Sequence, residues 1–461
     1  MRERTIQYTG CFHNRCLNLA FHSEYSEVAE RLSPLLSYDA VKASTSMPEL
    51  GQAVEALMRL KGIREWFDSF ELQQQLSSLV HEVWSSAQTD ADRRVLLDQK
   101  LSRLVSSLRS KIGVWRVVVP LANLTIPNRR KLRIGKVDLF RFSKNRRRRT
   151  LEQVRATLTR NPHYANKHDF INKYVDRIDK DEVGSLVERT CAETEVYGRD
   201  DDAFEEALPQ IEEAIAVIKF FHFWNDDSYG RYFGIVGRTI SQTRRVMLRY
   251  SKGFHLSGFE SAWVGTLFEY EIDADRLKFM EKGGFSELNQ ILAKEDRTHV
   301  EERIISAILW FAKAVDVVLR DSVKVKRDPI LGPEKRARRK PRVEMMGPND
   351  RLVKLMVSLE TLLLLDRNES IGANLSERVA MLVRRDYGQR KAIRKFVRDM
   401  YDKRSDVVHH GGKGITEGEL SQLTFLTQEV IVTLVKNYRR WKLASQDSIA
   451  EWFLRHKLGG H

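Results

Sequence analysis

The strongest constraint on the fold is an amphipathic helix that the sequence predicts from Gln389 to His409. Side chains at four–three spacing form one stripe along a helix. Here that stripe consists of Ile393, Val397, Met400, Arg404 and Val407. A guanidinium in such a stripe is costly to desolvate unless an anion faces it. We therefore expect this helix to pack against others and to bring Arg404 to an anion, either a carboxylate of the fold or a phosphate of a ligand.

Two glycines end this helix and leave a histidine in its last turn. His409 precedes Gly411-Gly412, and the C-terminal dipole of a helix favours a protonated imidazole. A histidine can take a proton from a ribose 2′-hydroxyl or give one to a leaving oxygen, and a guanidinium can stabilise the charge of the phosphorane. Arg404 and His409 are thus candidate catalytic residues for RNA cleavage without a metal. The alternative is a structural ion pair of Arg404 beside a helix-terminal histidine.

Three further residues are candidates for supporting this pair. Glu360 interrupts an otherwise apolar helix and is a natural carboxylate partner for Arg404, although a solvent-facing glutamate fits the pattern equally well. Asp406 would either position His409 or lie on the helix surface. His410 is the alternative base, because it is adjacent to His409 in the sequence.

The C-terminal third of the chain is purely helical by pattern. We expect four helices besides the one that carries Arg404: from Thr298 to about Arg320, from Asn349 or Asp350 to about Leu365, a short one opened by Asn374 with Glu377, and the last from Thr416 to about Arg440. Thr298 with Glu301 and Thr416 with Glu419 have the spacing of a capping box. The predicted domain, residues 298–461, is an up-and-down helical bundle.

The preceding part of the chain has a mixed pattern. Residues 1–110 carry apolar side chains mainly at helical spacing, whereas 111–297 form a mixed α/β region with a predicted sensing or positioning role. In that region Val114–Val119 and Lys131–Phe142 are predicted strands, and Phe204–Phe223 is a predicted helix. The fold class is therefore α+β and mainly α.

The net charge of +15 is typical of a protein with a polyanionic partner, although many basic proteins bind no nucleic acid. A polar loop at 322–347 interrupts the bundle between its first two long helices. It carries six candidate residues for RNA backbone binding: Lys335, Arg336, Arg338, Arg339, Lys340 and Arg342. A second run, Arg146–Arg149, is bounded by loop formers and is not predicted to be the face of a helix.

Other features narrow the class of protein. No segment reaches the roughly 20 apolar residues of a membrane span, and the first residues lack the apolar stretch of a secretion signal. Three cysteines argue against a disulfide scaffold and suit a reducing cytosol, so we expect a cytoplasmic protein. Cys11 and Cys16 do not have zinc-knuckle spacing, and there is no phosphate-binding glycine loop. We therefore expect no metal and no cofactor.

Two segments resemble a known family. From about 300 to 441 the chain resembles the HEPN domain, a helical nuclease module, in its Apea-like subgroup; the matching segments are 355–363 and 400–409. The likeness is fainter at 115–121 and 199–203. It implies a HEPN-type bundle, metal-independent endoribonuclease activity with Arg404 and His409 as catalytic residues, and an active site formed across a homodimer. Many members carry Asn, Asp or His after the arginine. Ser405 holds that supporting place here.

The same resemblance implies a biological setting. We expect anti-phage defence of the abortive type, with tRNA or another structured RNA as the substrate and a phage-derived trigger. One alternative is a HEPN toxin that a partner antitoxin silences. The other is a non-catalytic module that uses the same charge and fold for RNA binding or assembly.

Overall fold

The protein is described here from a computed structural model. It describes residues 26–36, 48–60, 63, 66–126, 131–160, 164–199, 202–225, 233–235, 248–250, 270–320, 342–345, 347–365, 369–410 and 414–459. The chain divides into two compact units, one formed by Met1–Trp115 with Tyr197–Ala203 and the other by Arg116–Val196 with Phe204–His461.

The described elements of the first unit up to Lys111 are helices. Its elements are α2 (Ser26–Leu32), the 3₁₀ turn η1 (Ser33–Leu36), α4 (Pro48–Met58), α5 (Ser69–Ser86) and α6 (Asp90–Lys111). Asp68 and Thr89 cap α5 and α6 by accepting hydrogen bonds from backbone N–H groups in the first turns. Leucine and valine side chains from all four α-helices form one buried cluster.

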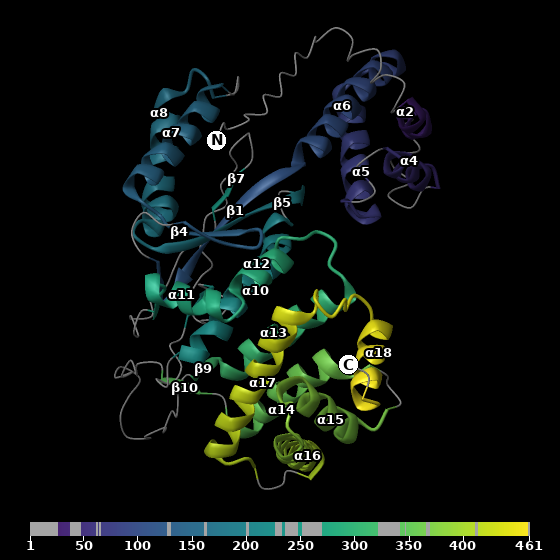
Figure 1. Cartoon of the computed structure of the whole chain (residues 1–461). Coiled ribbons are helices and arrows are strands. Elements are labelled where there is room, and N and C mark those ends of the chain that lie inside the picture. Colours follow the sequence, from purple (N-terminus) through teal and green to yellow (C-terminus); the bar gives the residue numbers. More distant parts are fainter. Residues whose placement is uncertain are drawn as a thin grey trace, which may run out of the picture. The chain divides into compact units, whose positions relative to one another are not determined.

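A mainly antiparallel sheet lies after these helices in the chain (Figure 1). Its strand order is β3-β4-β5-β1-β6, and β7 also pairs with β1. The strands are β1 (Ile112–Ala122), β3 (Leu132–Ile134), β4 (Val137–Arg141), β5 (Thr190–Arg199), β6 (Gly234–Ile235) and β7 (Leu248–Tyr250). The strands predicted at Val114–Val119 and within Lys131–Phe142 are therefore confirmed. The short strands β2 (Leu124–Thr125) and β8 (Tyr270–Glu271) pair in parallel separately.

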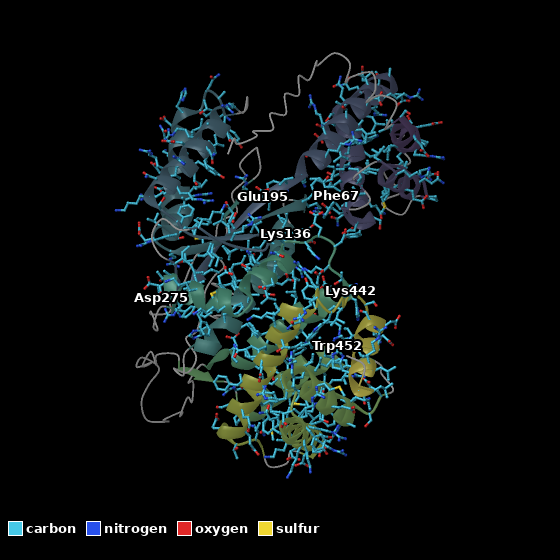
Figure 2. All side chains as sticks on the ribbon, viewed as in Figure 1. Phe67, Lys136, Glu195, Asp275, Lys442 and Trp452 are labelled. Carbon is cyan, nitrogen blue, oxygen red and sulfur yellow. The ribbon has the colours of Figure 1, made fainter. Side chains whose placement is uncertain are left out.

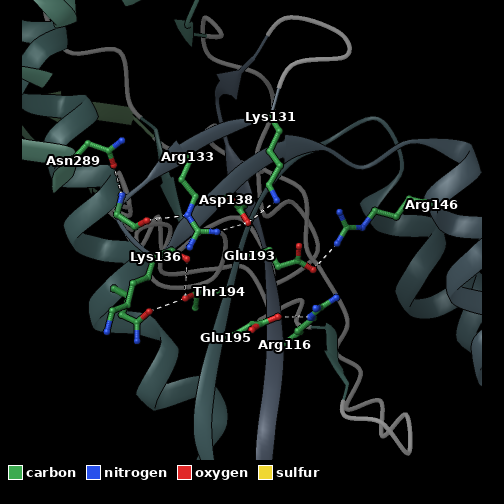
Figure 3. Close-up of polar contacts among 12 residues, drawn as sticks. Arg116, Lys131, Arg133, Lys136, Asp138, Arg146, Glu193, Thr194, Glu195 and Asn289 are labelled. Atoms are coloured by element: carbon green, nitrogen blue, oxygen red, sulfur yellow. Dashed lines mark hydrogen bonds and ion pairs between the residues drawn. The ribbon is translucent and has the colours of Figure 1, made fainter. Parts of the chain in front are cut away.

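Polar contacts tie this sheet to neighbouring helices (Figure 3). Asn289, on α12 (Phe285–Leu292), accepts a hydrogen bond from the N–H of Gly135 in the β3–β4 turn. Gly135 has a φ of +59°, and a Cβ there would lie 2.5 Å from the Cβ of Leu292. Only glycine combines that backbone conformation with so close a helix.

The Arg146–Arg149 run corrects one prediction, because it lies in a helix, α7 (Lys144–Arg160), which packs on α8 (His168–Ile178). Arg146 pairs with Glu193 on β5 (Figure 3), and its guanidinium group lies over the Phe140 ring. Arg147 donates to both carboxylate oxygens of Asp179, at 2.6 and 2.5 Å. These anions come from distant segments, so two neighbouring guanidinium groups are neutralised and the repulsion that disfavours a helix is removed.

The C-terminal helices are α13 (His299–Val315), α14 (Pro348–Leu363), α15 (Ile371–Val383), α16 (Tyr387–His410), α17 (Glu417–Asn437) and α18 (Gln446–Lys457). α14 packs against α13, α15, α16 and α17, and is therefore the central helix (Figure 1). Both predicted capping boxes, at Thr298–Glu301 and Thr416–Glu419, are confirmed. Gln428 on α17 donates to the carbonyl of Phe220 on α10 (Ala203–Asn225). This bond connects the bundle to α10, the helix predicted at Phe204–Phe223.

Three predictions for this region were wrong. The segment after α13 forms a two-stranded ladder, in which β9 (Val317–Arg320) pairs with β10 (Arg342–Met345), so the region is not purely helical. α15 begins after Ser370, and Asn374 lies inside it and donates to Glu369. α17 ends at Asn437 and is followed by α18, whose Trp452 is labelled in Figure 2. Helices, a sheet and small ladders together confirm the class α+β, mainly α.

Candidate active site

Arg404 lies on the packed face of α16, as the stripe predicts. Val397 and Met400 are buried, and the Arg404 side chain is 23% exposed. Its Nη2 atom is 3.7 Å from Oε2 of Glu360 on α14, whose side chain is 17% exposed. The structure therefore brings the predicted arginine and its predicted carboxylate partner together from two helices.

This ion pair is loose. The 3.7 Å separation exceeds hydrogen-bonding distance. Arg404 Nε and Glu360 Oε1 are both buried and have no hydrogen-bond partner among the described residues. Burial raises the pKa of Glu360, and the positive charge of Arg404 offsets this rise only in part. The buried Nε–H group of Arg404 can therefore still donate a hydrogen bond to another acceptor.

An aromatic ring lies near the guanidinium group of Arg404. The guanidinium carbon is 6.0 Å from the centre of the Tyr401 ring, one turn earlier on α16. That ring lies against Gly372 of α15, where an added Cβ would lie 2.8 Å from the ring atom Cδ1. Tyr401 therefore packs between α16 and α15, and the absence of a side chain at Gly372 makes room for it.

Lys403, which directly precedes Arg404, connects this turn of α16 to α17. Its Nζ atom is 2.7 Å from each carboxylate oxygen of Glu419, the glutamate of the α17 capping box. The bond from Lys403 and the bonds from Thr416 lower the pKa of Glu419 to about 2. Sequence reasoning assigned Glu419 to a cap alone, because its contact with Lys403 joins two helices and has no local pattern.

The C-terminal end of α14, which carries Glu360, is held by two arginines. Arg303 on α13 donates to the carbonyls of Leu362 and Leu364. Arg378 on α15 donates to the carbonyl of Leu363, and it also forms a two-bond pair with Glu369 at 2.7 Å. Cations at the last carbonyls of a helix satisfy its unpaired acceptors and its dipole. These arginines were not predicted, because their acceptors are backbone atoms of another helix.

Three of the remaining predicted site residues lie in the last turns of α16. His409 is exposed in the last turn, Ser405 is half-buried and Asp406 is exposed. The side chain of His410 lies outside the described residues. So do Lys335, Arg336, Arg338, Arg339 and Lys340, and the side chain of Arg342, whose backbone begins β10. The structure therefore describes the Arg404–Glu360 pair and the position of His409, but not the basic loop.

Comparison with family models, with curated proteins and with solved structures found no match to this chain. The resemblance to the HEPN domain is therefore an expectation that rests on the sequence motifs at 355–363 and 400–409. Within the described residues, no helix is both long enough and apolar enough to cross a membrane.

Proposed function

We propose that the C-terminal bundle is a metal-independent endoribonuclease of the HEPN type. The observation that carries the proposal is Arg404, held beside Glu360 with a buried Nε that lacks an acceptor among the described residues. A structural arginine normally forms hydrogen bonds to its carboxylate, as Arg199 does with Glu71 at 2.7 and 3.2 Å, whereas the closest approach of Arg404 to Glu360 is 3.7 Å. His409 is exposed five residues later on the same helix, where it is accessible to a substrate.

In this proposal the two side chains divide the chemistry. His409 takes the proton of the 2′-hydroxyl or protonates the leaving 5′-oxygen, and Arg404 stabilises the negative charge that develops on the phosphate. The 2′-oxygen forms a bond to phosphorus while the bond to the 5′-oxygen breaks, which yields a 2′,3′-cyclic phosphate and a 5′-hydroxyl. Glu360 orients the guanidinium. The proposed substrates are tRNA or other structured RNA, and the proposed setting is anti-phage abortive defence.

The test is a nuclease assay with the purified full chain, 5′-labelled tRNA and an excess of EDTA. We expect cleavage to persist in EDTA, to spare DNA of the same sequence, and to fall by at least about 100-fold in His409→Ala and in Arg404→Ala. His81→Ala, which removes an exposed histidine from α5, is the matched control and should cleave normally.

Three results would contradict this proposal. They are loss of cleavage in EDTA, full activity of His409→Ala, and loss in His410→Ala without loss in His409→Ala. RNA binding without any cleavage would instead favour the non-catalytic module, and cleavage that a cognate partner suppresses would favour the toxin.

A further inference from the structure

A second basic region lies far from Arg404 in the sequence, on α7 and α8. Segment 144–180 holds eleven Lys and Arg residues against four Asp and Glu residues, a net charge of +7. Nearly half of the +15 of the whole chain therefore lies in this segment, mostly on α7, which has seven Lys and Arg against one Glu, whereas α8 has two of each sign. A local excess of this size attracts a polyanion.

Three aromatic rings form a stack at the surface of this pair of helices. We call Tyr164, Phe170 and Tyr174 the aromatic stripe. The Phe170 ring is 5.1 Å from the Tyr164 ring at 10° and 5.9 Å from the Tyr174 ring at 23°. Phe170 is nevertheless 43% exposed. An exposed phenylalanine between two stacked rings leaves apolar aromatic surface in contact with water.

Cations lie along the same stripe. Lys167 Nζ is 5.8 Å from the centre of the Tyr164 ring, and the guanidinium carbon of Arg177 is 5.4 Å from the centre of the Tyr174 ring. On α8, positions 170, 173, 174 and 177 share one face, because side chains three and four residues apart are neighbours on a helix. Exposed Lys173 therefore lies beside Phe170 and Tyr174.

The opposite face of α8 does the packing. Ile171, Val175 and Ile178 are buried, so the helix does not need the aromatic stripe to bury its apolar side. The exposed Asp169 and Asp176 lie at one border of the striped face rather than within it. The face thus alternates flat rings and positive charges.

We propose that this face of α8, with Tyr164 and Lys167, binds single-stranded RNA. Unpaired bases would stack against the exposed part of the aromatic stripe, and Lys167, Lys173 and Arg177 would contact the flanking phosphates. Single strands fit this surface better than duplexes because only unpaired bases present a free ring face. The choice of RNA over single-stranded DNA rests on the proposed nuclease function, whereas the surface itself rests on charge and exposed rings.

The experiment measures binding, which keeps it separate from cleavage. Fluorescence anisotropy would follow a 20-nucleotide oligoadenylate RNA, the matching DNA strand and a blunt RNA duplex on the full chain carrying His409→Ala. Phe170→Leu, which keeps apolar bulk but removes the ring, should weaken single-strand affinity by roughly tenfold or more, and Phe170→Tyr should preserve it. Lys173→Ser with Arg177→Ser should weaken binding and lower the slope of affinity against salt.

Phe70→Ala is the matched control, because Phe70 is also exposed but lies on α5. Equal affinity of Phe170→Leu and the parent protein would overturn the proposal, as would an equal loss in Phe70→Ala or equal binding of the duplex. Equal affinity for the DNA strand would support a surface that uses bases and phosphates and does not recognise the ribose. Intact RNA binding by a parent protein that cleaves no RNA would contradict only the nuclease assignment.

Discussion

At the scale of single residues, the Arg404–Glu360 pair combines burial with incomplete bonding. A raised pKa means that the folded protein disfavours the charged carboxylate of Glu360. By linkage, the stability that this group contributes is fully present below its unfolded pKa and is lost as pH rises through the higher folded pKa. At neutral pH the charged form therefore costs stability, which is compatible with a role in orienting Arg404.

Replacing this carboxylate should separate stability from activity. Glu360→Gln removes the unfavourable charge, so the free energy of unfolding at neutral pH should stay within about 1 kcal/mol of the parent protein or rise. RNA cleavage should fall by at least about tenfold, because Arg404 loses the anion that orients it. Urea unfolding and the nuclease assay measure the two quantities. Glu451→Gln, an exposed substitution on α18, is the control. A large loss of stability with normal cleavage would show that Glu360 is structural.

At the scale of elements, Lys403 and Glu419 join α16 to the beginning of α17. The low pKa of Glu419, about 2, means that its contribution to stability is present above the unfolded value near 4.5 and is lost as pH falls from there towards about 2. The contact between the helices should therefore weaken in acid.

The corresponding variant is Glu419→Gln. At about pH 6 we expect it to lower the free energy of unfolding by about 1 kcal/mol, since solvent screens a pair that is one-third exposed. The difference from the parent protein should shrink towards about pH 3, because there the carboxylate is protonated in the unfolded chain but still largely charged in the folded protein. Urea titrations of both proteins at several pH values measure this difference in the free energy of unfolding. A difference that is the same at every pH would contradict an electrostatic contribution.

The basic segment between β9 and β10 also belongs to the scale of elements. Replacing Arg336, Arg338, Arg339 and Lys340 with Ser should weaken binding of many RNAs to a similar extent and lower the slope of affinity against salt. The reason is that contacts with phosphates carry no sequence preference. Filter binding at four salt concentrations measures the slope. Unchanged affinity and slope would assign the run to solubility or to another partner.

At the scale of the whole molecule, we predict a homodimer that joins two copies of the bundle. Val408 is 49% exposed one turn beyond Arg404, and this apolar surface beside the candidate catalytic residues suits a two-fold contact. Light scattering at micromolar concentration should then give about twice the chain mass of 53.7 kDa. Val408→Glu should shift the protein towards the monomer and reduce cleavage together. A single species near the chain mass for the parent protein would contradict the dimer.

The sequence alone determined those features of the fold that depend only on residues close together in the chain. The apolar stripe of α16 and both capping boxes follow from the spacing of side chains within one helix, and the structure confirms them. The partnership of Glu360 with Arg404 was also predictable, since each residue is a charge on an otherwise apolar face and the cost of burial favours their meeting.

Only the tertiary structure decided the contacts between distant segments. In the run Arg146–Arg149 only Arg148 has a charge partner nearby in sequence, Glu152, whereas Glu193 and Asp179, far along the chain, neutralise Arg146 and Arg147. The β9–β10 ladder likewise joins two segments, Val317–Arg320 and Arg342–Met345, that are far apart in the sequence. Gly372 makes room for Tyr401, and Lys403 bonds Glu419, through the packing of separate helices. Such contacts have no periodicity in sequence, because they depend on where whole elements meet.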